Sequence, residues 1–115
     1  MRVLIVEDDP VIAFGLEDLL SESGFQIAGV ALTLEKALAL IELGACDAAI
    51  LDANLDGVSA SPAGAAMTLR GLPYLVLSGY SAQQQGGAFR HAADYLQKPC
   101  VPERLIAALE KILPA

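Results

Sequence analysis

The chain of 115 residues has no tryptophan, two cysteines, one histidine and only seven lysines and arginines. Two thiols and a lone histidine provide too few soft ligands for a structural zinc site, so Cys46 and Cys100 are predicted to be free thiols and His91 a surface residue. The scarcity of basic residues leaves a net charge of −7, with no cluster that would displace counterions from nucleic acid. We therefore expect no nucleic-acid partner.

Long apolar runs are missing as well, although 55% of the residues are hydrophobic and the mean hydropathy is +0.52. No segment approaches the ~20 apolar residues that cross a bilayer. The apolar start, 1–6, meets Glu7, Asp8 and Asp9 before it reaches the length of a signal peptide. We therefore expect a cytoplasmic protein with no membrane partner, organised as a single domain over 1–115.

What is present is a regular alternation of strand-like and helix-like segments. Short segments typical of strands, most of them apolar, occur at 2–6, 25–31, 47–51, 73–77 and 93–97. Helices are predicted after the first, second, third and fifth of these, and their starts carry the usual signals: Asp9 before Pro10, Thr33, Ser61 before Pro62, and Val101 before Pro102. This alternation predicts an α/β fold, a flavodoxin-like doubly wound parallel sheet in the strand order 2-1-3-4-5, with helices on both faces.

One segment, from Ser81 to His91, interrupts the alternation between the fourth and fifth strands. It contains three glutamines at 83–85. The pair Gly86-Gly87 costs about 2 kcal/mol of helix propensity relative to alanine. We predict that any helix in this segment is short, irregular or mobile.

Polar side chains stand where four of the five predicted strands end. Glu7 and Asp8 follow the first strand, Asp52 the third, Ser78 the fourth and Lys98 the fifth. The second strand, which has no such residue, is the edge strand of the predicted order. Because ligands in open α/β sheets bind beyond the carboxyl ends of the strands, these residues predict one shared crevice.

The crevice would hold three carboxylates together with a cation and a hydroxyl. Two like charges ~4 Å apart repel by about 4 kcal/mol at an effective dielectric near 20, so the acidic group calls for a cation. Hard oxygen ligands favour Mg²⁺. A carboxylate such as Asp52 can also accept a phosphoryl group, and Lys98 and Ser78 are suited to its developing charge.

This pattern, Glu7-Asp8, Asp52, Ser78-Gly79 and Lys98-Pro99, resembles the receiver domain of bacterial response regulators over essentially the whole chain. The resemblance implies that Asp52 is phosphorylated from a phosphohistidine of a histidine kinase or histidine phosphotransfer protein. It implies direct Mg²⁺ ligation by Asp8 and Asp52, a contribution from the Asn54 backbone carbonyl, and a contribution from Glu7 through water.

The resemblance also assigns the remaining roles. Ser78 and Lys98 would hold the phosphoryl oxygens with the N–H groups of Ala53 and Gly79, and Tyr95 matches the family's aromatic switch position. A cis peptide between Lys98 and its proline is favoured. Such a domain catalyses only its own phosphorylation and dephosphorylation, signals to a downstream protein partner, and is a monomer or weak homodimer.

Three features set the chain apart within that family. The loop after the acceptor, 52–57, is short and has no proline. The segment Leu77 to Tyr80, followed by a weak helix, resembles a subset of receivers that are often single-domain and paired with atypical histidine kinases. Cys100 stands where the family often has an aromatic residue.

Other readings remain open at the level of sequence. A degenerate receiver would act as a phosphorylation-independent protein-binding module. A phosphohydrolase with an aspartate nucleophile usually has an acid two residues later, where this chain has Asn54, and a flavin or dinucleotide carrier would need a glycine-rich loop after the first strand. Asp9 is interpreted as a helix cap and Asp56, before a glycine, as a turn residue.

Overall fold

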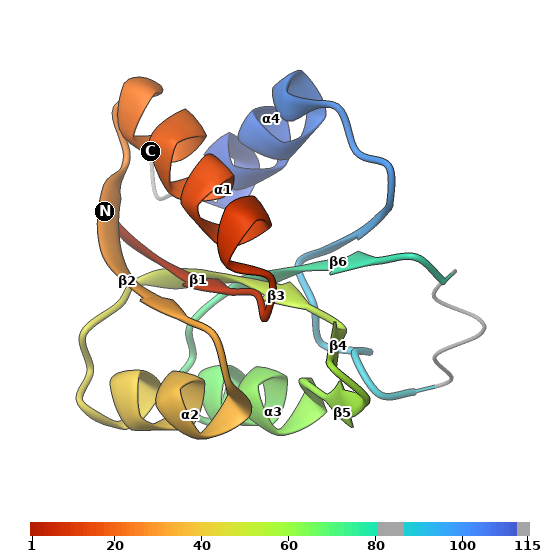
Figure 1. Cartoon of the computed structure of the whole chain (residues 1–115). Coiled ribbons are helices and arrows are strands. Elements are labelled where there is room, and N and C mark those ends of the chain that lie inside the picture. Colours follow the sequence, from red (N-terminus) through yellow and green to blue (C-terminus); the bar gives the residue numbers. More distant parts are fainter. Residues whose placement is uncertain (81–86, 113–115) are drawn as a thin grey trace.

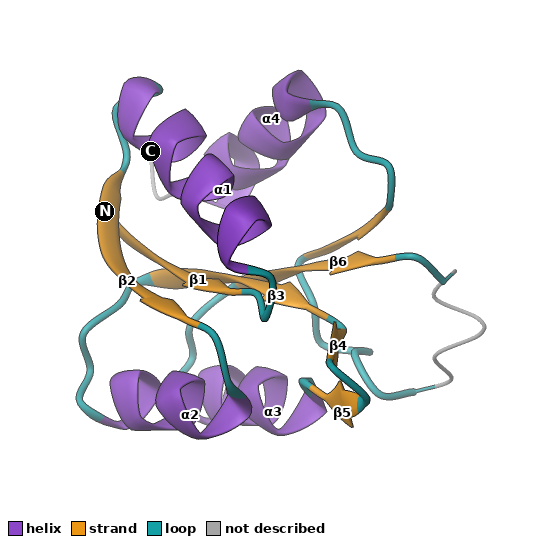
Figure 2. Cartoon of the chain, in the orientation of Figure 1, coloured by secondary structure: helices purple, strands orange, loops and turns teal. Residues whose placement is uncertain are grey.

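The computed structural model describes residues 1–80 and 87–112, which form a parallel sheet between two layers of helices (Figures 1 and 2). The strands of the sheet are β1 (Arg2–Val6), β2 (Gln26–Ala31), β3 (Ala48–Asp52), β6 (Tyr74–Ser78) and β7 (Asp94–Gln97). They lie in the order β2-β1-β3-β6-β7, and every neighbouring pair is parallel. In chain order this is 2-1-3-4-5, so the predicted fold class and topology are confirmed.

Helices cover both faces of the sheet, and each face has its own core. Helices α1 (Pro10–Glu22) and α4 (Pro102–Ile112) lie on one side, whereas α2 (Leu34–Glu42) and α3 (Ser61–Leu69) lie on the other (Figure 2). Because successive side chains of a strand point to opposite faces, Val3 and Ile5 join the first core while Leu4 and Val6 join the second. No helix within the described residues is both long enough and apolar enough to span a bilayer.

The central strands are buried along their whole length. Every residue of β3 and of β6 is buried, which explains why both read as nearly continuous apolar runs. The single polar residue at the carboxyl end of each strand, Asp52 and Ser78, is therefore held within a rigid and largely water-excluded frame.

Two of the predicted helix caps are confirmed by hydrogen bonds. The Asp9 carboxylate accepts from the Val11 N–H at 2.9 Å, and the Thr33 hydroxyl accepts from the Lys36 N–H at 3.2 Å. Each satisfies one of the N–H groups that have no partner at a helix start.

The predicted cap at Ser61 is wrong by one residue. Ala60 occupies the N-cap of α3 without a side-chain hydrogen bond, and Ser61 is the first helical residue. The reason is tertiary: the Ala60 N–H donates to the Ala53 carbonyl and Ala60 is fully buried, so the chain turns into the helix one residue early. The Ser61 N–H instead donates a hydrogen bond to the Ser59 hydroxyl.

A small antiparallel hairpin follows β3 where the sequence indicated only a short loop. Its strands are β4 (Asn54–Leu55) and β5 (Val58–Ser59), joined by a two-residue turn at Asp56 and Gly57 with φ angles of 53° and 87°. Positive φ at both positions is what a tight hairpin turn requires, and the Asp-Gly pair supplies it. The prediction that Asp56 is a turn residue is confirmed, but strands of two residues are too short to produce a periodic signal.

The irregular segment at 81–91 is described only from residue 87 onward, and residues 81–86 lie outside the described structure. Residues 87–91 form turns rather than helix. Within this part Phe89 is buried, with its ring centroid 6.5 Å from that of Tyr95, and His91 is exposed as predicted.

Gly64 in α3 makes room for the ring of Tyr74, and this contact supports a stability prediction. A Cβ atom added at Gly64 would lie 2.9 Å from the Tyr74 hydroxyl oxygen and 3.0 Å from Cζ, and Tyr74 is only 2% exposed. The gain in helix propensity is about 1 kcal/mol, whereas overpacking costs about 1–3 kcal/mol. We expect Gly64→Ala to lower the free energy of unfolding by about 1 kcal/mol in urea denaturation.

The matched control is Gly15→Ala in α1, where an added Cβ meets nothing within 4 Å. This variant should be more stable than wild type by up to about 1 kcal/mol. A Gly64→Ala protein as stable as Gly15→Ala would show that the Tyr74 contact places no constraint on α3.

Candidate functional site

The sheet brings the predicted polar residues to one edge. Strands β1, β3, β6 and β7 are contiguous, and their register pairs Asp52 with Leu77 and Ser78 with Gln97. Glu7, Asp52 and Ser78 are 2%, 8% and 2% exposed, and they are the buried polar or charged side chains among the residues that the structure describes. Burying polar or charged groups is unfavourable unless they are paired, so these three side chains need bonding partners at this edge.

Three carboxylates converge at this edge. Glu7, Asp8 and Asp52 each provide an oxygen, and these oxygens all lie within 4.8 Å of one another. The buried Glu7 Oε2 has no hydrogen-bond partner among the described residues. Hard, closely spaced carboxylate oxygens with unused bonding capacity fit Mg²⁺, so the residues present suit the predicted ion.

Lys98 lies against the same carboxylates. Its Nζ is 3.1 Å from Asp52 Oδ2 and 3.6 Å from Glu7 Oε2. The backbone holds it there, because the Lys98 N–H donates to the Ser78 carbonyl at 2.7 Å. The peptide bond between Lys98 and Pro99 is cis. Burial by itself would lower the pKa of Lys98, but the charge and hydrogen bond of Asp52, followed by those of Glu7, outweigh it and raise the pKa. Lys98 is therefore a cation at neutral pH.

For Glu7, unlike Lys98, the effect of burial on the pKa prevails. Burial, followed by the hydrogen bond and negative charge of Asp52, raises the pKa of Glu7 to about 7, against a smaller lowering by the Asp9 N–H and by Lys98. The Asp9 N–H donates to Glu7 Oε1 at 3.2 Å. Without a metal ion, the Glu7 carboxyl is thus partly protonated near pH 7.

The raised pKa of Glu7 predicts a pH dependence of stability in metal-free protein. Between pH 4.5, the ordinary value, and about 7, the folded state keeps a proton that the unfolded chain has lost, so stability falls as pH rises. We expect the free energy of unfolding in EDTA to drop by roughly 1–3 kcal/mol from pH 5 to pH 8. Urea denaturation at several pH values measures it.

Glu7→Gln should make the free energy of unfolding less dependent on pH, because the amide does not titrate. Glu22→Gln, a change at an exposed glutamate of α1, should preserve the wild-type pH dependence. A Glu7→Gln protein with the wild-type pH dependence would assign that dependence to another group.

The backbone N–H groups that follow Asp52 have different partners in the unphosphorylated chain. The Ala53 N–H donates to the Leu77 carbonyl at 2.9 Å, because the ladder between β3 and β6 continues one residue past the strand. The Asn54 N–H faces Asp52 Oδ1 at 3.3 Å. Asn54 is therefore a further candidate backbone donor beside the predicted Ala53, and only the register of the sheet reveals it.

Ser78 and Tyr95 are connected through the backbone of Tyr80. The Tyr80 N–H donates to the Ser78 hydroxyl at 3.0 Å, and the hydroxyl of the half-buried Tyr95 donates to the Tyr80 carbonyl at 3.1 Å. Gly79, between them, is exposed. The loop after β6 thus links the predicted phosphoryl-binding hydroxyl to the predicted switch aromatic.

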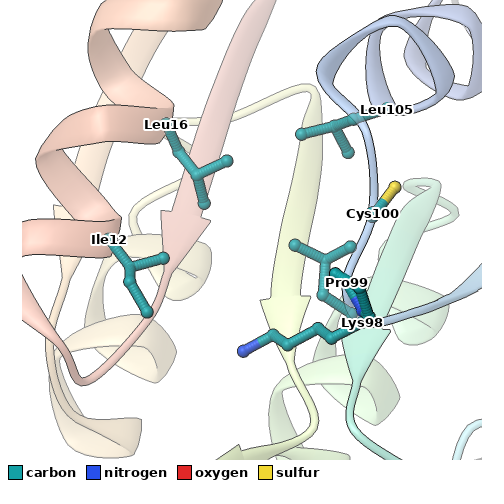
Figure 3. Close-up of a pocket in the computed structure, with 7 residues that line it drawn as sticks. Ile12, Leu16, Lys98, Pro99, Cys100 and Leu105 are labelled. Atoms are coloured by element: carbon teal, nitrogen blue, oxygen red, sulfur yellow. The ribbon is translucent and has the colours of Figure 1, made fainter.

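An apolar cavity of about 450 Å³ adjoins Lys98 between α1 and the loop before α4 (Figure 3). Its walls include the aliphatic part of Lys98 and the side chains of Ile12, Leu16 and Leu105. Cys100 also lines it and is a free thiol, as is the buried Cys46, so both predictions of free cysteines are confirmed.

Comparison with known proteins agrees with this geometry. The family model for the response regulator receiver domain matches residues 3–110. The transcriptional regulatory proteins PdtaR and PrrA of Mycobacterium tuberculosis are 35% and 38% identical to the chain, over 95% and 97% of its length. The match covers 55% and 49% of those proteins, so the chain spans about half the length of the curated relatives it matches.

Solved structures show the same fold. The response regulator TrrA of Thermotoga maritima, solved in complex with Mg²⁺-BeF, is 27% identical with a TM-score of 0.86, covering 97% of this chain and 98% of that one. The match over nearly the entire chain, together with the acidic group, the buried aspartate and the lysine at neighbouring strand ends, identifies the family. The chain belongs to the response regulator receiver domain family.

Proposed function

We propose that this receiver accepts a phosphoryl group on Asp52 in a Mg²⁺-dependent reaction and signals by a change in conformation. The observation that carries the proposal is the position of the Asp52 carboxylate. It is buried, lies 3.1 Å from the Lys98 ammonium and belongs to the acidic group of Glu7 and Asp8. A nucleophilic carboxylate with a cation on one side and metal ligands on the other is suited to phosphoryl transfer.

Asp8 and Asp52 would ligate the ion directly, Glu7 through water, and Asn54 through its backbone carbonyl. Bound there, Mg²⁺ would neutralise the acidic group and the charge of the incoming phosphoryl oxygens. Glu7 Oε2 supports this assignment, because this buried oxygen has an ion-pair contact with Lys98 at 3.6 Å but no hydrogen bond among the described residues, so it could accept one from a metal-bound water. The structure of TrrA with Mg²⁺-BeF supports it by analogy.

The chain's own groups then carry the transfer. An Asp52 oxygen attacks the phosphorus of a phosphohistidine, the phosphorus–nitrogen bond breaks, and the imidazole nitrogen keeps the bonding electrons. The equatorial oxygens would be stabilised by Lys98, the Ser78 hydroxyl and the N–H groups of Ala53, Asn54 and Gly79. Positioning these donors before the reaction is the main contribution of the fold, since the sheet holds them rigidly.

The proposed switch follows from the link through Tyr80. A phosphoryl group that drew the Ser78 hydroxyl toward Asp52 would weaken its hydrogen bond from the Tyr80 N–H. A shift of the Tyr80 backbone would then displace the carbonyl that accepts from the Tyr95 hydroxyl. We infer that this changes the surface near β7 and the loop after β6 and thereby the affinity for a downstream protein partner.

The phosphodonor would be a histidine kinase or histidine phosphotransfer protein. The apolar cavity is lined by Lys98, which contacts Asp52, and by Ile12 of α1, which is 43% exposed. Helix α1 and the loop before α4 also carry the exposed apolar side chains of Val11, Phe14 and Val101, which are 81%, 52% and 60% exposed. We propose that the donor docks here. We also propose that residues 1–115 act as one cytoplasmic domain, as a monomer or weak homodimer, and turn over no external metabolite.

The proposal is tested by incubation with acetyl phosphate or phosphoramidate, with Mg²⁺ or with EDTA, followed by intact-mass measurement. We expect a labile adduct of one phosphoryl group that requires Mg²⁺, is absent from Asp52→Asn and persists in Asp18→Asn, a control at an exposed acid of α1. An adduct in Asp52→Asn would overturn the assignment. A protein that takes up neither Mg²⁺ nor phosphoryl would be the phosphorylation-independent binding module.

A further inference from the structure

A second groove lies between the turn that follows β2 and the β4–β5 hairpin. It encloses about 440 Å³, within the roughly 300–1,000 Å³ of typical ligand pockets. Its lining comes from three segments that are distant in sequence: the loop after β1, the β2–α2 turn with the start of α2, and the β4–β5 hairpin. The lining residues are Asp8, Leu32, Thr33, Leu34, Glu35, Leu55, Asp56 and Val58.

The floor of this groove is apolar and unusually accessible. Leu32, from the turn after β2, and Val58, from β5, are 37% and 49% exposed, although each is a large hydrophobic side chain. Leu55, from β4, also lines the groove and is only 4% exposed. Exposed apolar side chains that gather in one concavity, rather than scatter singly, are typical of an interaction site.

The charge on the groove has one sign. Asp8, Glu35 and Asp56 line it, and no lysine, arginine or histidine does. The cavity beside α1 differs, because there Lys98 supplies the charged wall. An apolar floor with carboxylates around it is complementary to a side chain such as leucine flanked by cations, and it disfavours an acidic or purely polar occupant.

We propose that this groove binds a basic peptide segment of another protein, in which an apolar side chain lies between lysines or arginines. The apolar side chain would rest on Leu32, Leu55 and Val58, and the cations would pair with Glu35 and Asp56. The groove does not include the proposed donor surface of α1, but it shares Asp8 with the proposed Mg²⁺ site, so the peptide is tested in EDTA. It provides the receiver with a second partner site.

The test uses the amidated, acetylated peptide KLKLK as the probe, titrated into ¹⁵N-labelled protein in EDTA and followed by NMR. We expect saturable shifts of the amides of Thr33, Leu34, Asp56 and Val58, with weaker binding as salt is raised. ELELE, with the charges reversed, and KGKGK, without the apolar side chains, should each bind more weakly.

Variants outside the proposed phosphorylation site sharpen the test. Glu35→Gln and Asp56→Asn should each weaken KLKLK binding about two- to five-fold, as expected for an exposed ion pair; asparagine also tolerates the positive φ of position 56. Val58→Thr replaces one methyl group with a hydroxyl of nearly the same size and should weaken binding by up to about fourfold. Glu22→Gln, the same charge change at an exposed position on α1, should leave it unchanged.

Three results would overturn the proposal. KLKLK shifts that map to the cavity beside α1, or that never saturate, would show that the groove is not the basic-peptide site. Equal binding of ELELE would remove the argument from charge. If the groove amides shift when the unliganded protein is concentrated, the occupant is a second copy of this chain rather than a basic partner. Failure here leaves the Asp52 mass assay untouched, so the two proposals are judged separately.

Discussion

Lys98→Ala should slow phosphorylation by acetyl phosphate about 100- to 1,000-fold at saturating Mg²⁺. The Lys98 ammonium lies 3.1 Å from Asp52 Oδ2, so it is the side-chain cation placed to meet charge that develops on the phosphoryl oxygens. Removing one preorganised electrostatic group from a water-excluded site typically costs about that factor. The rate of adduct formation, followed by intact mass, measures it.

The same variant should behave differently in the absence of metal. Glu7 and Asp52 would lose the cation that lies between them, so the protein in EDTA at pH 8 should be less stable than wild type. Lys36→Ala, a change at an exposed lysine of α2, should alter neither rate nor stability appreciably. Lys98→Arg should recover only part of the rate, since a planar guanidinium does not fit where a compact ammonium does. A Lys98→Ala protein with the wild-type rate would remove Lys98 from the chemistry.

Asp8→Asn should weaken Mg²⁺ binding roughly 10- to 100-fold and slow phosphorylation at subsaturating Mg²⁺ by the same factor. The carboxylate oxygens of the cluster lie within 4.8 Å of one another, so each charge contributes directly to holding the ion. Titration calorimetry with MgCl₂ gives the dissociation constant of each protein, and a sufficiently high Mg²⁺ concentration should restore much of the lost rate.

In the absence of Mg²⁺, Asp8→Asn should be favourable, because it should raise the stability of the protein. Without Mg²⁺ the three carboxylates repel one another, so neutralising one should stabilise the metal-free protein by up to about 1 kcal/mol while binding is lost. Asp18→Asn serves as the control for charge alone. If Asp8→Asn binds Mg²⁺ as wild type does, the acidic group is structural and the ion is held elsewhere.

Particular residues show why much of this site could be predicted from the sequence. Asp52, Ser78 and Lys98 each stand at the end of a predicted strand, and parallel strands place their carboxyl ends on one edge whatever the details of packing. The same reasoning predicted the caps at Asp9 and Thr33, because a cap depends on residues only two or three positions away. Short-range chemistry and chain direction were enough for these features.

Other features depend on an exact register or on burial by distant segments, which a pattern of residue types does not contain. A shift of one residue decides whether the N–H of Ala53 or of Asn54 faces Asp52, and the continued ladder to β6 decides it. The displaced cap at Ser61 has the same origin, in the hydrogen bond between Ala60 and Ala53. Such outcomes follow from contacts between elements rather than from local propensity.

By itself, then, the sequence determined the α/β fold, the strand order and the identity of the side chains at the carboxyl edge, because periodicity and chain topology are written along the chain. The tertiary structure decided the state of those side chains. Packing buries Glu7 beside Asp52 and raises its pKa to about 7, places Lys98 between the two, and connects Ser78 to Tyr95 through Tyr80. Desolvation and through-space charge depend on three-dimensional neighbours, so only the folded chain specifies them.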